Sequence, residues 1–159
     1  MNLVLKKDQF NIESIQFMKT RKNIIMENSL FIKLLYSDEN IVMNSIFMEF
    51  PVKPRDITRN LLFYQPSENE ALLQQMAQIE RDILGYYRMV HKCEKTEVYL
   101  MATHLERGNI KFNYIPSTAS PIVHEKFVMK ISGIWENSDT MGLNYKLFVI
   151  PTYLKIFMV

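Results

Sequence analysis

A long amphipathic segment in the middle of the chain, flanked on both sides by β-type sequence, constrains the fold more than any other feature. Its apolar residues recur at three- and four-residue steps, which is the spacing of one face of an α-helix. These residues are Leu72, Leu73, Met76, Ile79, Ile83, Leu84 and Tyr87. Ser67 and Glu70 have the spacing of a capping box, in which each side chain bonds the backbone N–H of the other residue. We therefore predict a helix from Ser67 to about Met89 or His91, weakened by roughly 1 kcal/mol at Gly85, where the missing side chain would allow close packing.

The residues before this helix have the composition of β-strands. Asn23–Met26 is rich in β-forming residues, and Leu30–Tyr36 is an apolar run. In Ile41–Phe50, apolar side chains point to both faces, as expected of a strand near the middle of a barrel or under a helix. Pro51 ends this strand, because proline lacks the N–H that a β-ladder requires. A short helix or strand is expected around Ile57–Tyr64.

The residues after the helix predict a shorter helix and then a closing group of strands. The pattern of Val98–Glu106 predicts the second helix, and Gly108 can adopt the left-handed conformation that often follows a helix end. Ile110–Ile115 predicts a short strand. The strongest hairpin signal in the chain joins Lys126–Trp135 to Gly142–Ile150 through the polar turn at residues 136–141.

Alternation along the first strand of this hairpin assigns its side chains to two faces. One face carries Val128, Lys130, Ser132 and Ile134. The other face carries Phe127, Met129, Ile131, Gly133 and Trp135. The single tryptophan is therefore expected on the same side as Phe127 and Met129.

Together these elements predict one α+β domain, mainly β, over residues 1–159. N-terminal strands occupy about residues 1–50, a helical insertion about residues 57–107, and closing strands about residues 110–159. A five-stranded OB barrel has a comparable order of three strands, a helix and two strands. We therefore predict an OB-like antiparallel barrel with a helical insertion between the third and fourth strands. A general α+β sandwich is the alternative.

Composition indicates an intracellular protein that is not embedded in a membrane. The single cysteine, Cys93, excludes an internal disulfide and suits a reducing compartment. Residues 1–10 contain no apolar core of a secretory signal, and no segment approaches the ~18–20 apolar residues that span a bilayer. The expected location is the cytoplasm or the nucleus. A net charge of +2 is too small to demonstrate an anionic partner.

No segment carries a recognisable catalytic or metal-binding motif. A structural zinc site has paired ligands such as Cys-x-x-Cys, whereas Cys93, His91, His104 and His124 are scattered. Cys93 with any histidine would supply a nucleophile and a base, but no local signature supports such a pair. Gly-x-Gly-x-x-Gly and the Walker lysine motif are also absent. We expect no enzymatic activity, no cofactor and no metal.

Aromatic and basic residues are interleaved near the closing strands. The residues expected to contact nucleic acid are Trp135, Tyr145, Lys146, Lys130, Lys111, Arg107, Phe112 and Tyr114. Single-stranded nucleic acid requires this mixture, since cations contact phosphates and flat rings stack on unpaired bases for ~1–3 kcal/mol each. The alternative is that the rings at the strand ends pack in the core.

Two strings of residues resemble a known family. The first lies between Ile79 and Tyr114 and contains Ile-Glu-Arg-Asp-Ile-Leu-Gly-Tyr-Tyr, His-Lys-Cys-Glu-Lys-Thr and His-Leu-Glu-Arg-Gly-Asn-Ile-Lys. The second is Val-Met-Lys-Ile-Ser-Gly-Ile-Trp-Glu-Asn from Val128, followed by Gly-Leu-Asn-Tyr-Lys from Gly142. Over roughly residues 70–150, the chain resembles small OB-fold-like single-stranded DNA-binding proteins of large eukaryotic DNA viruses and virus-like mobile elements. The resemblance implies a role in DNA replication or recombination, with the closing hairpin and the segment Arg107–Lys111 at the DNA.

The residues and the resemblance together predict a non-catalytic protein that binds single-stranded DNA, with RNA not separated from DNA, through base stacking and phosphate contacts. The alternative is a protein-interaction or structural subunit of a virion or replisome that oligomerises through sheet edges. The apolar tail Leu147–Val159 would supply such an edge or a dimer interface. We expect a homo-oligomer.

Overall fold

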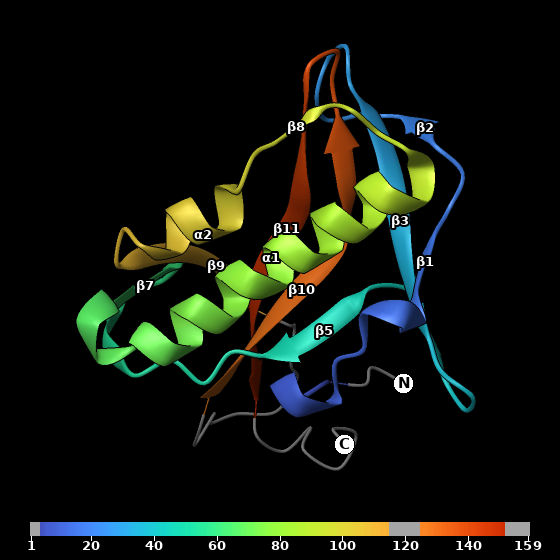
Figure 1. Ribbon diagram of the computed structural model, residues 1–159. Helices are drawn as coiled ribbons and strands as arrows, with labels where there is room; N and C mark the ends of the chain where they lie inside the picture. Colours follow the sequence, from blue (N-terminus) through green and yellow to red (C-terminus); the bar gives the residue numbers. More distant parts are fainter. Residues whose placement is uncertain (1–3, 115–124, 152–159) are drawn as a thin grey trace.

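The computed structural model describes residues 4–114 and 125–151 (Figure 1). The helices are α1 (Glu70–His91) and α2 (Leu100–Leu105), with short 3-10 turns at Lys7–Gln9, Ile12–Ser14 and Pro66–Glu68. The strands are β1 (Ile15–Phe17), β2 (Arg21–Lys22), β3 (Leu30–Ser37), β4 (Val42–Met43), β5 (Ile46–Glu49), β6 (Pro54–Ile57), β7 (Leu61–Tyr64), β8 (Thr96–Glu97), β9 (Asn109–Tyr114), β10 (Glu125–Glu136) and β11 (Thr140–Pro151). This part of the chain is mainly β with two α-helices, as predicted. Neither helix has the length and apolar character needed to cross a membrane.

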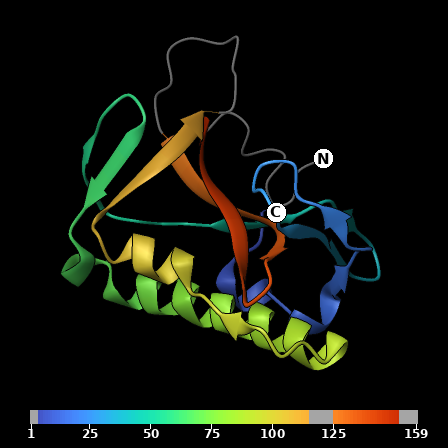
Figure 2. The same cartoon turned by 90° about the horizontal axis from the view of Figure 1, so that it is seen from above.

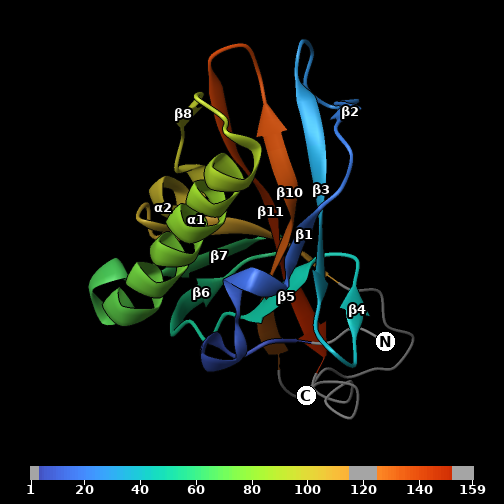
Figure 3. The same ribbon diagram turned by 45° about the vertical axis from the view of Figure 1, so that its right-hand side comes forward.

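The strands form one sheet whose centre is the long hairpin of β10 and β11. The strand order is β1-β3-β10-β11-β9-β7-β6, and β5 pairs with the part of the β10 edge that β3 leaves free (Figure 3). Neighbouring strands are antiparallel, except that β11 runs parallel to both β8 and β9. In the described residues the path is open, since β1 and β6 at its ends do not pair.

The predicted OB-like barrel is therefore not confirmed. A barrel requires the strands at the two ends of the path to pair with each other, which is not seen in residues 4–114 and 125–151. The insertion also differs from the prediction, because the strands β1 to β7 all precede α1. Sequence patterns indicate which residues are extended, whereas closure depends on pairing between strands that are far apart in the chain.

Helix α1 lies across one face of the sheet, with α2 on the same side (Figures 1 and 2). The predicted apolar stripe is confirmed, since its members Leu73, Met76, Ile79, Ile83, Leu84 and Tyr87 are buried. They share one buried cluster with side chains of the N-terminal strands and of the closing hairpin, including Ile32, Leu34, Met48, Met129, Ile131 and Leu147. All three predicted segments of the chain thus contribute to the same core.

The start of α1 differs from the sequence prediction. Asn69, not Ser67, occupies the N-cap, and Ser67 lies in the 3-10 turn before it. The Asn69 side chain is engaged elsewhere, because its Oδ1 accepts a hydrogen bond of 2.7 Å from the backbone N–H of Lys53. The prediction of a capping box at Ser67 is therefore wrong, whereas the predicted end of the helix at His91 is confirmed. The prediction of close packing at Gly85 is also wrong, since no atom lies within 4 Å of a Cβ added there.

Two features of the N-terminal strands were predicted incorrectly. Asn23–Met26 forms bends rather than a strand, and Ile41–Phe50 is divided into β4 and β5 by residues 44 and 45. Because of this interruption, Met43 and Ile46 are both buried, although strict alternation would place them on opposite faces.

A β-bulge at Ser132 changes the faces of β10. Ile131 pairs with Tyr145 and Gly133 pairs with Asn144, so Ser132 is the extra residue. Ile131 and Ile134 consequently both enter the core, and Trp135 points to the opposite face from Ile131. The prediction that Trp135 shares a face with Met129 is wrong, because alternation cannot anticipate a bulge.

Candidate nucleic-acid interface

A row of lysine side chains crosses the sheet on the face opposite α1. Lys130 of β10 and Lys146 of β11 are partners in the ladder, and Lys130 also partners Phe47 of β5. Partners in a ladder point to the same face, so these side chains lie side by side. Lys111 of β9 extends the row, because it alternates with Phe112, whose side chain is buried in the core. We call Lys111, Lys130 and Lys146 the lysine row.

Two further cations lie on the same face on β2 and β3, while Lys126 of β10 is ion-paired there with Glu49. Arg21 of β2 pairs with Phe31 of β3, which in turn pairs with Trp135. Lys33 pairs with Gly133 two positions along, and so lies on the same face as Phe31. The strands β2 and β3 thus add positive charge beyond the lysine row.

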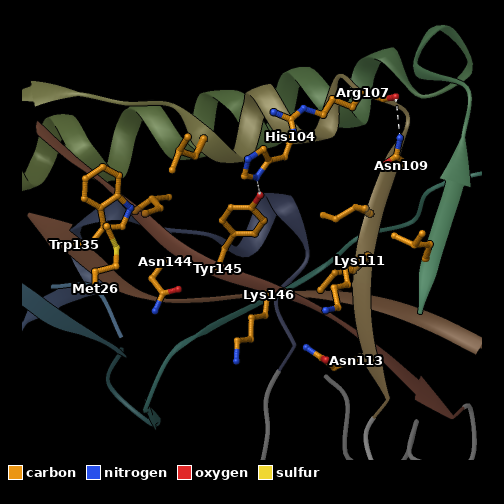
Figure 4. Close-up of a pocket in the computed structure, with 15 residues that line it drawn as sticks. Met26, His104, Arg107, Asn109, Lys111, Asn113, Trp135, Asn144, Tyr145 and Lys146 are labelled. Carbon is orange, nitrogen blue, oxygen red and sulfur yellow. Dashed lines mark hydrogen bonds between the residues drawn. The ribbon is translucent and has the colours of Figure 1, made fainter. Parts of the chain in front are cut away.

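A cavity of about 650 Å³ opens beside the lysine row, between α2, β9 and β11 (Figure 4). Its cationic lining residues are Arg107, Lys111 and Lys146. Its uncharged polar and aromatic residues include His104, Asn109, Asn113, Trp135, Asn144 and Tyr145. None of the described lining residues is acidic. The cavity therefore combines positive charge, hydrogen-bonding amides and flat rings.

The pairing of β11 explains why a cavity forms here. Thr140 and Met141 pair with β8, and residues 147–149 pair with β9. Between these two contacts, no described strand pairs with β11 on the side away from β10. Helix α2 lies beside the unpaired residues of β11, and its residues Leu100 and His104 line the cavity.

Two buried residues hold α2 in position. Glu80 of α1 is completely buried, and its carboxylate accepts hydrogen bonds from the backbone N–H groups of Met101 at 2.8 Å and Ala102 at 2.9 Å. Burial raises the pKa of Glu80, and these two hydrogen bonds partly offset the rise. At the other end of α2, the Tyr64 hydroxyl donates to the carbonyl of Leu105, and burial raises the Tyr64 pKa to about 12. Both ends of the helix that carries His104 are therefore anchored.

Tyr145 and His104 form a neutral pair in the cavity. The Tyr145 hydroxyl contacts Nδ1 of His104. Burial, and next the negative charge of Glu80, raises the Tyr145 pKa far above its usual range. Burial and then the nearby Arg107 lower the pKa of His104. The phenol consequently stays protonated at neutral pH, and the pair presents no anion to a ligand.

Trp135 is less accessible than stacking on a base requires. Its side chain is 8% exposed, and its ring lies directly over Gly142, the partner residue in β11. Met26 lies at the same end of the cavity (Figure 4). A stacking contact with Trp135 would therefore require the ring or the neighbouring Met26 to move, and its predicted role stays a prediction.

The structure brings together five of the eight predicted contact residues. Arg107, Lys111, Trp135, Tyr145 and Lys146 all line the cavity. Lys130 lies in the lysine row, where its Nζ is 5.7 Å from the centre of the Phe47 ring and 6.0 Å from that of Phe148. Phe112 is buried, and its ring packs edge-on against Phe127 in the core. Tyr114 belongs to β9, and its side chain lies outside the described residues.

Several lining residues were missed by the sequence prediction. Asn109 and Asn113 each lie two residues from Lys111 on β9, so they share its face, and the period of two in a strand could have revealed them. Asn144 lies two residues from Lys146 on β11 and carries the same signal, whereas Met26 reaches the cavity from the loop between β2 and β3 and carries none. The sequence offers His104 as a metal ligand or as a base beside Cys93, but gives no signal for a place in a nucleic-acid site.

The single cysteine belongs to a different cluster. The carboxylate of Glu136 accepts a hydrogen bond of 2.7 Å from the Tyr87 hydroxyl and lies 3.2 Å from Lys95 Nζ. Cys93 Sγ is 3.7 Å from the same carboxylate. This group ties the end of α1 to the turn of the hairpin. In residues 4–114 and 125–151, no three His, Cys, Asp or Glu side chains are grouped so as to hold a metal ion.

Comparison of the chain with protein-family models, with curated proteins and with solved structures finds no match. The resemblance to viral single-stranded DNA-binding proteins therefore remains a prediction that depends on the two strings of residues.

Proposed function

We propose that this protein binds single-stranded DNA across the lysine row and in the adjoining cavity. The observation that carries this proposal is the position of Lys111, Lys130 and Lys146 on three adjacent strands, beside a cavity whose described lining has no acidic residue. Adjacent strands are about 4.8 Å apart, so the row extends over about 10 Å. A flexible phosphate backbone can follow such a row, whereas isolated cations would supply only one contact each.

The cavity supplies groups suited to unpaired bases. Asn109, Asn113 and Asn144 carry amides that both donate and accept hydrogen bonds. On the α2 side of the sheet, the partly buried Tyr145 ring and the His104 ring add flat surfaces to the lining, and stacking of a base on such a ring contributes ~1–3 kcal/mol. Bases in a duplex are already paired and stacked, so these groups favour a single strand. RNA offers the same phosphates and base edges, and the experiment below compares the two.

Further parts of the proposal follow from the resemblance. We place the activity in viral-type DNA replication or recombination, inside the cell, in an OB-like sheet whose closing strands carry the site. This placement is supported by the second resembling string and the end of the first, which lie on β9, β10 and β11, the strands that carry the lysine row. Homo-oligomerisation is a separate expectation that light scattering over a range of concentrations tests.

The alternative of an edge interface formed by the apolar tail is weakened by the structure. Leu147, Val149 and Ile150 are buried, and β11 pairs with a strand on each side at residues 147–149. The remainder of the predicted tail lies outside the described residues. This part of Leu147–Val159 therefore belongs to the interior rather than to an edge.

A fluorescence-anisotropy titration tests the proposal. A labelled deoxythymidine oligonucleotide should bind at low salt, and log K should fall linearly with log[salt] by about 0.7 per phosphate contacted. Changing Lys111, Lys130 and Lys146 together to Gln should remove most of the affinity. Lys92→Gln, at the end of α1, is the matched control and should leave binding unchanged. Absence of binding at low salt, or equal binding by the triple variant, would refute the proposal, and a uridine oligonucleotide shows whether RNA is also bound.

A further inference from the structure

Two neighbouring isoleucines stand almost fully in water at the tip of the loop between β2 and β3. Ile24 is 99% exposed and Ile25 is 86% exposed. An isolated exposed aliphatic residue is common on a protein surface, but two consecutive ones at a tip leave a contiguous apolar area in water, which is unfavourable. This cost indicates that the tip has a partner.

The loop is held in a defined shape. Oδ1 of Asn23 accepts hydrogen bonds from the backbone N–H groups of Ile25 at 3.0 Å and Met26 at 3.3 Å. The Ser29 hydroxyl donates to the carbonyl of Met26 at 3.0 Å, and the Asn23 N–H donates to the Ser29 carbonyl at 2.9 Å. Asn28 supplies the left-handed conformation of the turn, with φ of 56°. The isoleucines are therefore presented by a closed turn.

The surroundings of the tip indicate the chemistry of the partner. Lys19, Arg21 and Lys22 precede it and are all exposed, and Glu27 is the acidic residue of the loop. The positive excess favours an anionic partner. The same loop carries Met26, which lines the cavity beside Trp135 (Figure 4). The tip is thus continuous with the face proposed above to bind DNA.

We infer that Ile24 and Ile25 form a wedge that inserts between bases where a single strand meets a duplex. This inference rests on the proposed function, and it specifies the ligand as a DNA with a single-stranded tail and an adjoining duplex. Isoleucine side chains of DNA-binding proteins insert between base steps and unstack them. Lys19, Arg21 and Lys22 would contact the phosphates on either side, while the tail lies along the lysine row.

The test compares a deoxythymidine oligonucleotide with a tailed duplex of the same tail length, using the full chain. The native protein should bind the tailed duplex about tenfold more tightly, because the wedge adds contacts that a single strand cannot supply. A 2-aminopurine placed at the junction should brighten as its neighbour unstacks. The double variant Ile24→Ser/Ile25→Ser should lose both effects and retain its affinity for the single strand. Leucine at both positions should restore them.

A matched control is Val42→Ser, since Val42 of the short strand β4 is also an aliphatic residue and is 72% exposed. It should behave as the native protein does. Equal affinity of the native protein for both DNAs, or an unchanged preference in the serine variant, would overturn the wedge while leaving single-strand binding intact. Failure to bind either DNA would overturn the proposed function itself. Binding to phosphatidylserine vesicles that is lost in the serine variant, without any junction preference, would instead identify a membrane-inserting tip.

Discussion

Lys130 and Lys146 are direct partners in the β10–β11 ladder, so two positive side chains stand opposite each other on one face of the sheet. Like charges at such positions oppose folding by roughly 0.2–1 kcal/mol. Contacts of Lys130 with the rings of Phe47 and Phe148 compensate part of this repulsion. A bound phosphate would remove the remainder, so this pair links the stability of the sheet to its proposed ligand.

Lys146→Gln should change stability and binding in opposite directions. Removing the repulsion should raise the free energy of unfolding by a few tenths of a kcal/mol. Affinity for a deoxythymidine oligonucleotide should fall, and the salt dependence should weaken by about 0.7 per lost phosphate contact. Urea denaturation and anisotropy titrations measure the two quantities, with Lys92→Gln as the control. An unchanged salt dependence would show that Lys146 does not contact phosphate.

Gly142→Ala should disturb the tryptophan site. A Cβ at this position would lie 2.5 Å from an atom of the Trp135 ring, so the ring must move. We expect a destabilisation of about 1–3 kcal/mol, which is typical of overpacking, together with a red shift of tryptophan emission. Gly85→Ala is the control, because nothing lies within 4 Å of its added Cβ, and it should stabilise α1 by about 1 kcal/mol. Equal stability of the two variants would contradict the packing of Trp135 on Gly142.

Glu80 should make the folded protein less stable as pH rises, which is the opposite of the usual effect of a carboxylate. Because burial raises its pKa in the folded protein, the folded state binds this proton more tightly than the unfolded state. The contribution of Glu80 to stability is therefore largest below the ordinary glutamate pKa of about 4.3 and decreases as pH rises through the raised value. Urea denaturation of the native protein and of Glu80→Gln at several pH values measures this difference. A native advantage that grows with rising pH would contradict the prediction.

DNA affinity should increase in acid through His104. Protonation adds a cation to the lining of the cavity, and its lowered pKa places this gain below the ordinary histidine value of about 6.5. A nearby phosphate favours the protonated ring, so the complex binds the proton more tightly and affinity rises as pH falls. Anisotropy titrations over this range should show the increase in the native protein and in His91→Gln, which alters a histidine at the end of α1. His104→Gln should lack it, and persistence of the increase in that variant would assign it to another group.

Much of the fold is readable from neighbouring residues. The stripe along α1, the strand β3 and the closing hairpin all depend on local periodicity, and they form where the sequence predicts them. Gly108 has the left-handed conformation expected after α2, with φ of 77°. The basic and aromatic residues Arg107, Lys111, Tyr145 and Lys146 are also identifiable, because their chemistry is suited to nucleic acid before their positions are known.

The tertiary structure alone decides how these residues are combined. The bulge at Ser132 turns Trp135 away from the face that alternation assigns to it, and Met26 reaches the cavity from a loop more than a hundred residues earlier in the chain. Asn69 replaces Ser67 as the cap of α1, with its side chain bonded to Lys53. Each of these outcomes depends on contacts between segments that are distant in sequence. Local preferences are too weak to specify such contacts, so the sequence determines the elements and their chemistry, while strand pairing and burial determine the site.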